Sequence, residues 1–114
     1  MLRLCLALVL AVPCFAEPVA LHLSARAEKH VREGHFAGGK NSRGKSLFSA
    51  GTDLLELLKA AEASKPRRER NGRDKRVTPT KEAVGTDGRS GKAVRSYVVI
   101  SDPDGEVVTM YPGR

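Results

Sequence analysis

The C-terminal part of the chain constrains the fold most strongly, because it contains two segments with strand-like patterns. These are KAVRSYVVIS over residues 92–101 and EVVTMY over residues 106–111, with DPDG between them. Pro and Gly at these positions are typical of a tight turn. We therefore predict an antiparallel hairpin, which must bury one of its faces against other elements.

A helix is predicted ahead of this hairpin. Ser24 is a suitable N-cap for ARAEKHVRE, in which Leu23, Ala27 and Val31 recur every four residues, and Gly34 is a suitable end.

A second helix is predicted over DLLELLKAAEA, where Asp53 and Glu56 resemble a capping box. Its apolar stripe would be Leu54, Leu55, Leu58 and Ala61. Helices first and a hairpin last predict a small α+β domain, with N-terminal helices packed on a C-terminal antiparallel sheet. Residues 77–84 are a weaker strand candidate, because Pro79 interrupts them.

The N-terminus, MLRLCLALVLAVPCFA, has the features of a secretory signal peptide. Arg3 precedes an apolar run over residues 4–12, and small residues favour cleavage after Ala16. The run is about half of the ~20 residues that a membrane-spanning helix needs, so we expect no stable membrane insertion. We predict a signal peptide over 1–16, a single α+β domain over 17–114, and export to the periplasm or the medium.

Cleavage would remove both cysteines, Cys5 and Cys14. A disulfide, a cysteine-ligated metal and a cysteine nucleophile are then excluded for residues 17–114. The fold must be held by burial alone, which is feasible for one domain of this length.

The net charge of the whole chain is +7, and it is concentrated in residues 65–76, where seven basic residues meet two acidic ones. One interpretation is a solvated, flexible connection. The other is a contact with nucleic acid or another polyanion. No aromatic residue interrupts the run, so it has no stacking platform of its own.

Residues 39–46, GKNSRGKS, match the phosphate-binding pattern G-x-x-x-x-G-K-[ST]. A nucleotide-binding loop follows a buried strand and opens a helix, whereas EGHFAG precedes this one. We therefore reject a nucleoside triphosphatase. The loop is predicted instead to hold a phosphodiester, with Lys40, Arg43, Lys45 and Ser46 as its ligands.

Cleaving RNA without a metal requires a base, an acid and groups that stabilise the charged intermediate. Histidine suits both proton transfers. His30 lies at the end of the first predicted helix and His35 just beyond Gly34, where a break could turn both toward one pocket. Either one alone would be an ordinary surface histidine, and we take His22 to be incidental. No carboxylate joins the histidines at a ligand spacing, so we expect no metal and no cofactor.

The last predicted strand adds a polar face. A period of two puts Val108 and Met110 on one side, with Val107, Thr109 and Tyr111 on the other. Thr109 and Tyr111 could bind phosphate there, or they could be ordinary β-favouring residues on a half-exposed sheet.

The preceding strand has residues of matching parity, Arg95 and Tyr97. Parity alone does not fix the pairing register. If the register brings Arg95 beside Thr109 and Tyr111, its guanidinium could contribute to phosphate binding.

The chain resembles the bacterial EndoU-like ribonucleases in the order of its segments. These are KHVREGH, GG, GKSLF, a Leu-rich helix, a basic connection and SYVVISDPDGEVVTMYPG. The same ordered set is also similar to the C-terminal nuclease domains of contact-dependent-inhibition toxins. These domains have a barnase–EndoU–colicin–RelE type fold. The resemblance covers about residues 24 to 114.

The resemblance implies an exported, toxin-like, metal-independent endoribonuclease that leaves a 2′,3′-cyclic phosphate. His30, Lys45, Thr109 and Tyr111 match the family's site residues, and His35 is a candidate for the second histidine. The implied partners are RNA and a protein inhibitor, and we expect a monomer. Two alternatives stay open: a catalytically inactive exported protein that binds nucleic acid or polyanions, and a structural periplasmic protein.

Overall fold

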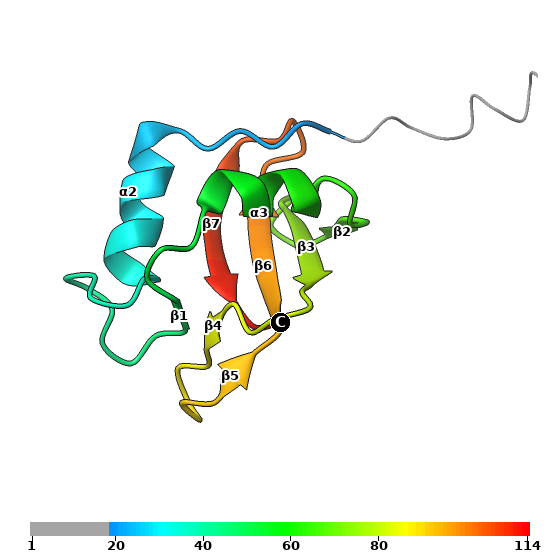
Figure 1. The fold of residues 1–114 in the computed structure, drawn as a ribbon. Helices are drawn as coiled ribbons and strands as arrows, with labels where there is room; N and C mark the ends of the chain where they lie inside the picture. Colours follow the sequence, from blue (N-terminus) through cyan, green and yellow to red (C-terminus); the bar gives the residue numbers. More distant parts are fainter. Residues whose placement is uncertain (1–18) are drawn as a thin grey trace, which may run out of the picture.

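The computed structural model describes residues 19–114, so the predicted signal peptide lies outside the described residues. The described part is a small α+β domain with two helices and two antiparallel sheets (Figure 1). Its elements, in chain order, are α2 (Ala25–Gly34), β1 (Leu47–Phe48), α3 (Leu54–Ala61), β2 (Arg67–Arg68), β3 (Asp74–Pro79), β4 (Gly85–Thr86), β5 (Ala93–Val94), β6 (Ser96–Ser101) and β7 (Val107–Pro112).

Both helices begin at the predicted caps. The Ser24 hydroxyl accepts a hydrogen bond from the Ala27 amide at 3.1 Å. The Asp53 carboxylate accepts from the amides of Leu55 and Glu56 at 3.1 and 3.2 Å. These side chains satisfy amides that lack a partner within the helix, which fixes where each helix starts.

The apolar stripe of α3 differs from the predicted one at a single position. Leu54, Leu58 and Ala61 are buried, as predicted, and Leu57 packs against the core beside them. Leu55 is 68% exposed, so its assignment to the stripe was wrong. Successive helical residues are turned by about 100°, which points Leu55 away from the buried side.

The larger sheet has the strand order β2-β3-β6-β7. β6 and β7 form the predicted antiparallel hairpin. In its turn the Gly105 amide donates to the Asp102 carbonyl at 2.9 Å, and Gly105 has a φ of 99°, which favours glycine.

The basic run forms part of this sheet. β2 and the start of β3 pair with each other, with Arg67 opposite Lys75 and Arg68 opposite Asp74. Residues 67–79 are therefore a β-hairpin instead of a loose connection, and we call it the basic hairpin. Its second strand covers residues 74–79, so the strand predicted at 77–84 is displaced toward the N-terminus. β3 ends at Pro79, which has no amide to donate.

The smaller sheet has the order β1-β4-β5 and was not foreseen. The strand predicted over residues 92–101 is broken at Arg95, because Ala93 and Val94 pair with β4 whereas residues 96–101 pair with β3 and β7. One predicted strand thus contributes to two sheets.

The two faces of the larger sheet differ in burial. The inner face is buried throughout and consists of Asp74, Arg76, Thr78, Tyr97, Val99, Ser101, Met110 and Pro112. The outer face is mostly half-exposed or exposed and consists of Lys75, Val77, Pro79, Ser96, Val98, Ile100, Thr109 and Tyr111. α3 covers the inner face, and the Tyr97 hydroxyl donates to the Leu57 carbonyl at 2.6 Å (Figure 1).

Two residues lie on a different face from the one that their parity alone indicated. Tyr97 lies on the inner face, because it pairs with Pro112 and not with Thr109 or Tyr111. Val107 also lies in the core, because the register shifts at Ile100 and Ser101 and leaves Val108 as an extra residue. Because a β-bulge adds one residue to the strand, the residues before it point to the opposite face from the one that simple alternation predicts.

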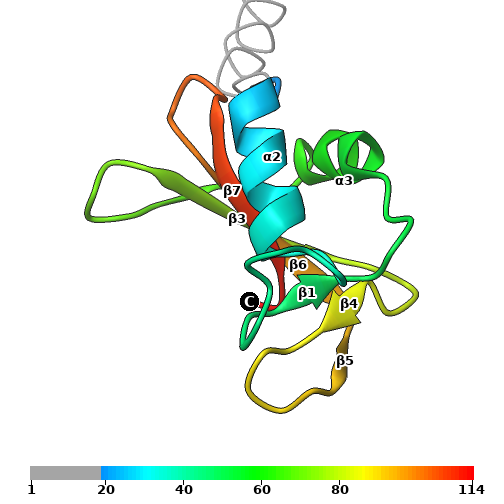
Figure 2. The same cartoon turned by 90° about the vertical axis from the view of Figure 1, so that its left-hand side faces the viewer.

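The helices and the basic hairpin surround the sheet on different sides. α2 lies along β7, whereas α3 and the tip of the basic hairpin project to opposite sides of the sheet (Figure 2). Residues before α2 are attached to the start of β7, since the His22 amide donates to the Gly105 carbonyl and the Val107 amide donates to the His22 carbonyl.

Neither helix within residues 19–114 has the length and apolar character that crossing a bilayer requires.

Candidate active site

The end of α2 brings the two candidate histidines together. His30 is exposed about one turn before the end of α2, and His35 follows Gly34 as the C-terminal cap with a φ of −130°. Their ring centroids are 5.9 Å apart, at an interplanar angle of 70°. The expected break at Gly34 therefore does turn both imidazoles toward the same region.

The segment after the glycine-rich loop holds His35 in place. The Phe48 amide donates to the His35 carbonyl at 2.7 Å, and Nδ1 of the His35 ring lies 3.1 Å from the Ser46 carbonyl oxygen. A carbonyl only accepts hydrogen bonds, so this contact requires the proton to be on Nδ1. In the neutral ring Nε2 is then unprotonated and able to accept a proton.

The surroundings of His35 favour this neutral form. Burial lowers its pKa below the ordinary value of 6.5, and the positive charges of His30 and Lys45 act in the same direction. The hydrogen bond to Ser46 opposes these effects without reversing them. At neutral pH the ring is therefore mostly a free base.

The Lys45 ammonium lies over the end of α2. A Cβ atom placed on Gly34 would be 3.4 Å from Nζ of Lys45, so the absent side chain leaves room for this approach. A cation is favourable near the C-terminus of a helix. Lys45 thus stands next to His35, as its effect on the His35 pKa also indicates.

Tyr111 extends the cluster onto the outer face of the sheet. Its ring centroid lies 5.8 Å from that of His35. Burial and the charge of Glu69 raise the pKa of Tyr111, which keeps its hydroxyl protonated and able to donate. Thr109 lies on the same face two residues earlier, and its buried Oγ1 has no hydrogen-bond partner among residues 19–114.

The other candidate residues of the glycine-rich loop have contacts outside the histidine cluster or are exposed. The Ser46 hydroxyl accepts a hydrogen bond from the Gly88 amide at 2.9 Å, so it ties two loops together. Lys40 Nζ lies 3.5 Å from the Glu33 carboxylate. Arg43 is exposed. A substrate contact by these residues stays a prediction.

Arg95 lies away from the histidine pair. It is exposed between β5 and β6 and lines a cavity of about 360 Å³ with Val77, Pro79, Ser96 and Arg114. Three of these residues belong to the outer face, so Arg95 borders the face that carries Tyr111. It lines no cavity with His30 among those found within residues 19–114.

The glycine-rich loop connects a helix to a short strand, the reverse of the order in a nucleotide-binding loop. Within residues 19–114, no three side chains of His, Cys, Asp or Glu are grouped closely enough to hold a metal ion. The groups that the cluster itself offers are two imidazoles, an ammonium and hydroxyl groups.

Two groups that belong to this site were not predicted from the sequence. One is the Ser46 carbonyl, which fixes the tautomer of His35 and has no sequence signature of its own, since every residue has a carbonyl. The other is Arg26, which lies on α2 near His30. Its spacing of four residues from His30 could have indicated a shared face.

No family model matches the sequence, and a search of curated proteins found no match. Function is therefore inferred from the geometry and chemistry of the cluster.

Proposed function

We propose that the protein is an exported, toxin-like, metal-independent endoribonuclease that cleaves RNA by 2′-OH transesterification. The observation that carries this proposal is the convergence of His30, His35, Lys45 and Tyr111, which come from three separate parts of the chain. A pair of imidazoles next to a cation and a phenol supplies the groups that this reaction needs.

His35 is the general base in the proposed reaction. Its Nε2 takes the proton of the 2′-OH, and the 2′-oxygen attacks the adjacent phosphorus. The bond from phosphorus to the 5′-oxygen breaks, and His30 in its imidazolium form donates a proton to that oxygen. The products are a 2′,3′-cyclic phosphate and a 5′-hydroxyl.

Two other side chains stabilise the charge that develops on the phosphate oxygens. Lys45 supplies a positive charge beside the base, and the protonated Tyr111 hydroxyl donates a hydrogen bond. Thr109 lies on the same face, and its buried Oγ1 would have to become accessible before it could donate as well. Groups already held in place cost no reorganisation as the reaction proceeds.

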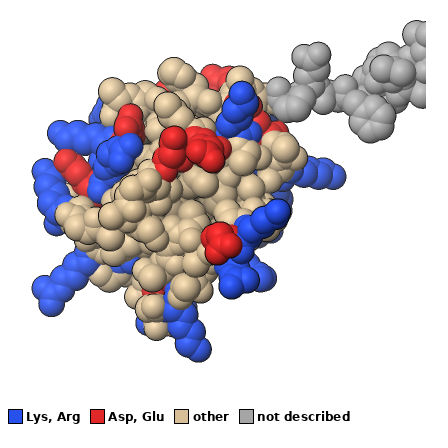
Figure 3. Space-filling model, viewed as in Figure 1, with Lys and Arg blue, Asp and Glu red and all other residues tan. Residues whose placement is uncertain are grey.

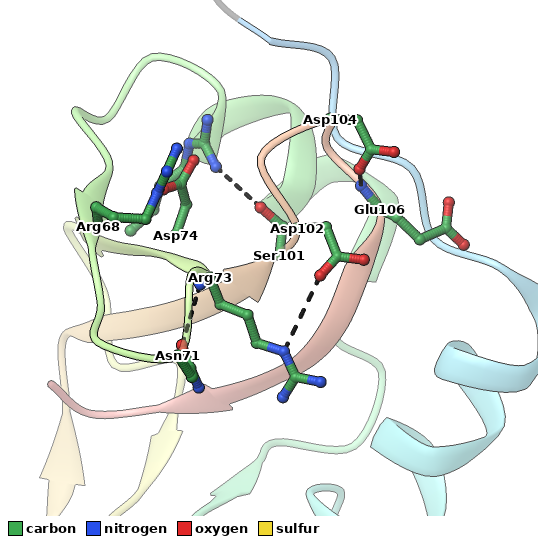
Figure 4. Close-up of polar contacts among 9 residues, drawn as sticks. Arg68, Asn71, Arg73, Asp74, Ser101, Asp102, Asp104 and Glu106 are labelled. Atoms are coloured by element: carbon green, nitrogen blue, oxygen red, sulfur yellow. Dashed lines mark hydrogen bonds and ion pairs between the residues drawn. The ribbon is translucent and has the colours of Figure 1, made fainter.

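The basic hairpin supports RNA as the partner. Arg68 and Arg73 are ion-paired, with Asp74 at 2.7 Å and Asp102 at 4.0 Å (Figure 4). Arg70 and Lys75 form no ion pair within residues 19–114, so their charges are available to phosphates. The hairpin tip projects to the side of the sheet opposite α3, where the outer face carries Tyr111 (Figure 2).

The first test is incubation of the purified protein with end-labelled RNA in EDTA, alongside His30→Ala and the control His22→Ala. We expect fragments with cyclic-phosphate ends from the wild type and from His22→Ala, and intact RNA with His30→Ala. Equal cleavage by all three proteins would rule out His30 as the catalyst.

The same experiment addresses the alternative of an inactive binding protein, which the unpaired Arg70 and Lys75 favour. Intact RNA with every protein, together with salt-dependent binding to folded wild type, would replace the enzyme by a polyanion-binding protein. Export is tested separately by the mass of the protein recovered from the periplasm or medium, which should begin at Glu17.

A toxin-like nuclease requires an inhibitor in the cell that makes it, so we include a protein inhibitor among the proposed partners. Covering the histidine cluster would be sufficient for inhibition. The proposed active form is a monomer, because all of its proposed catalytic groups come from one chain.

A further inference from the structure

A second surface feature adjoins His30 on the side away from Tyr111. It is a groove of about 370 Å³ between α2 and the start of β7, lined by Ser24, Arg26, Ala27, His30, Val107 and Val108. This volume is at the lower end of the range for small-molecule sites. The groove could therefore hold one nucleoside but not a longer stretch of RNA.

The β-bulge in β7 shapes the wall of this groove. Ser101 pairs with Val107 and Ile100 pairs with Thr109, so Val108 has no partner residue opposite it. Val107 is buried in the core, whereas Val108 is half-buried and lines the groove. Together with Ala27 they form apolar walls, which suit the flat faces of a nucleobase.

The polar groups lie on the helix side of the groove. Arg26 and His30 are four residues apart on α2, which places them on the same side with about 6 Å of rise between them. Arg26 is exposed and forms no ion pair among residues 19–114. The acidic neighbour Glu28 is instead bound to Arg32 at 2.8 Å.

We propose that this groove binds the nucleoside immediately 3′ of the cleaved bond, and that Arg26 binds the phosphate that follows it. The inference rests on the proposed function, in which His30 donates its proton to the 5′-oxygen. That oxygen belongs to the 3′-side nucleoside, so this nucleoside must lie next to His30. His30 itself lines the groove, so a nucleoside bound there would lie next to it. Arg26, which lines the same groove, supplies a positive charge for the next phosphate.

The occupant is thereby a specific part of the RNA. A nucleobase would contact Ala27, Val107 and Val108, and its ribose would lie near His30. Apolar contacts of this kind depend little on the identity of the base, so we expect the groove to accept all four bases at the 3′ position.

The experiment uses two oligonucleotides that contain a single ribonucleotide and therefore a single cleavable bond. The short one ends with the nucleoside 3′ of that bond, and the long one has one further phosphate and nucleoside. We compare the wild type with Arg26→Gln and with the matched control Lys29→Gln, which removes the same charge from a position of α2 that does not line the groove.

For the long substrate we expect Arg26→Gln to lower kcat/KM by about tenfold, as for removal of a charge-assisted hydrogen bond. For the short substrate both variants should stay within about twofold of the wild type. An equal decrease from Arg26→Gln on both substrates, or an equal decrease from Lys29→Gln, would overturn the proposal.

A binding measurement separates this inference from the proposed function. The long oligonucleotide with a 2′-deoxy sugar at the cleavage position cannot react, and its binding is followed by the methyl NMR signals of Ala27 and Val108. We expect these signals to shift in the wild type, with the titration midpoint raised about tenfold in Arg26→Gln. Signals that do not move would refute the groove even if the protein cleaves RNA. Shifts without any cleavage would keep the groove and refute the enzyme.

Discussion

The inner and outer faces of the four-stranded sheet both carry polar side chains, but those side chains differ in exposure. On the inner face, Nη1 of Arg76 donates to the Ser101 hydroxyl at 3.2 Å, and the Thr78 hydroxyl lies 2.9 Å from that of Ser64. On the outer face, the Thr109 hydroxyl has no such partner within residues 19–114. Nε of the buried Arg76 likewise has no partner within these residues. The two faces therefore differ in exposure, because the inner face is buried throughout whereas Thr109 and Tyr111 are half-buried.

The surface charge follows the same division. On the side of the molecule that carries α3, Lys and Arg lie mainly at the margins (Figure 3). The unpaired cations of the basic hairpin belong to a segment whose tip projects to the other side (Figure 2). Under the proposed function, one side of the sheet maintains the fold and the other binds the RNA. The following predictions test this division.

The largest expected effect is on the reaction itself, in His35→Asn. The Asn amide can still donate to the Ser46 carbonyl, but it has no base at the position of Nε2. We expect kcat to fall by about 10² to 10⁴, as for removal of a general base, while the melting temperature stays near that of the wild type. Single-turnover cleavage and thermal unfolding measure the two quantities. A large decrease in stability with unchanged kcat would assign His35 a structural role.

The inner face should respond in stability instead. Met110 is completely buried, so Met110→Ala should lower the free energy of unfolding by about 2–5 kcal/mol. Val77 on the outer face is 40% exposed, and Val77→Ala should cost well below about 1 kcal/mol. Urea denaturation of both variants gives the comparison. Equal decreases would mean that the outer face is covered in solution, for example by a second copy of the chain.

RNA affinity should depend on the charges that have no protein partner. Replacing both Arg70 and Lys75 with Gln should reduce the slope of log affinity against log salt by about 0.7 for each phosphate that is no longer neutralised, as for single strands. Lys59→Gln, an exposed position on α3, is the control and should leave the slope unchanged. Binding to a 2′-deoxy oligonucleotide at several salt concentrations supplies the slopes. If Lys59→Gln has the larger effect, the RNA crosses the opposite side of the sheet.

The smallest effect concerns pH. Lys45 contributes to the lowered pKa of His35, so Lys45→Gln should raise that pKa. A base must be unprotonated, so activity falls as the pH decreases through the pKa of His35. In Lys45→Gln this fall should therefore begin at a higher pH, in addition to a lower maximal rate. Lys40→Gln removes the same charge from the same loop without contributing to the His35 pKa, so its activity should fall over the same pH range as that of the wild type, whatever its maximal rate.

Much of the fold follows from local patterns in the sequence. The caps at Ser24 and Asp53 and the turn at Gly105 each depend on contacts between near neighbours in the chain, which residue types reveal directly. The approach of His30 and His35 was predictable for the same reason, since only a helix end at Gly34 separates them.

The sequence-based predictions failed where the pairing of distant segments sets the position of a residue. The exact pairing of β6 with β7 placed Tyr97 inside, and the bulge at Val108 placed Val107 inside with it. Arg95 interrupts a continuous strand pattern because the residues before it find a different pairing partner, β4. Alternation alone does not specify register, and a shift of one residue exchanges the two faces.

The sequence by itself determined the α+β class, the helix ends, the C-terminal hairpin and the candidate histidines, because these depend on short-range hydrogen bonding and on periodicity. Only the tertiary structure decided that Lys45 and Tyr111 meet His35, that the Ser46 carbonyl fixes its tautomer, and that the basic run is a hairpin. Most of those contacts join segments that are separated along the chain. They form only when burial of the shared core brings the segments together, and no local pattern encodes that geometry.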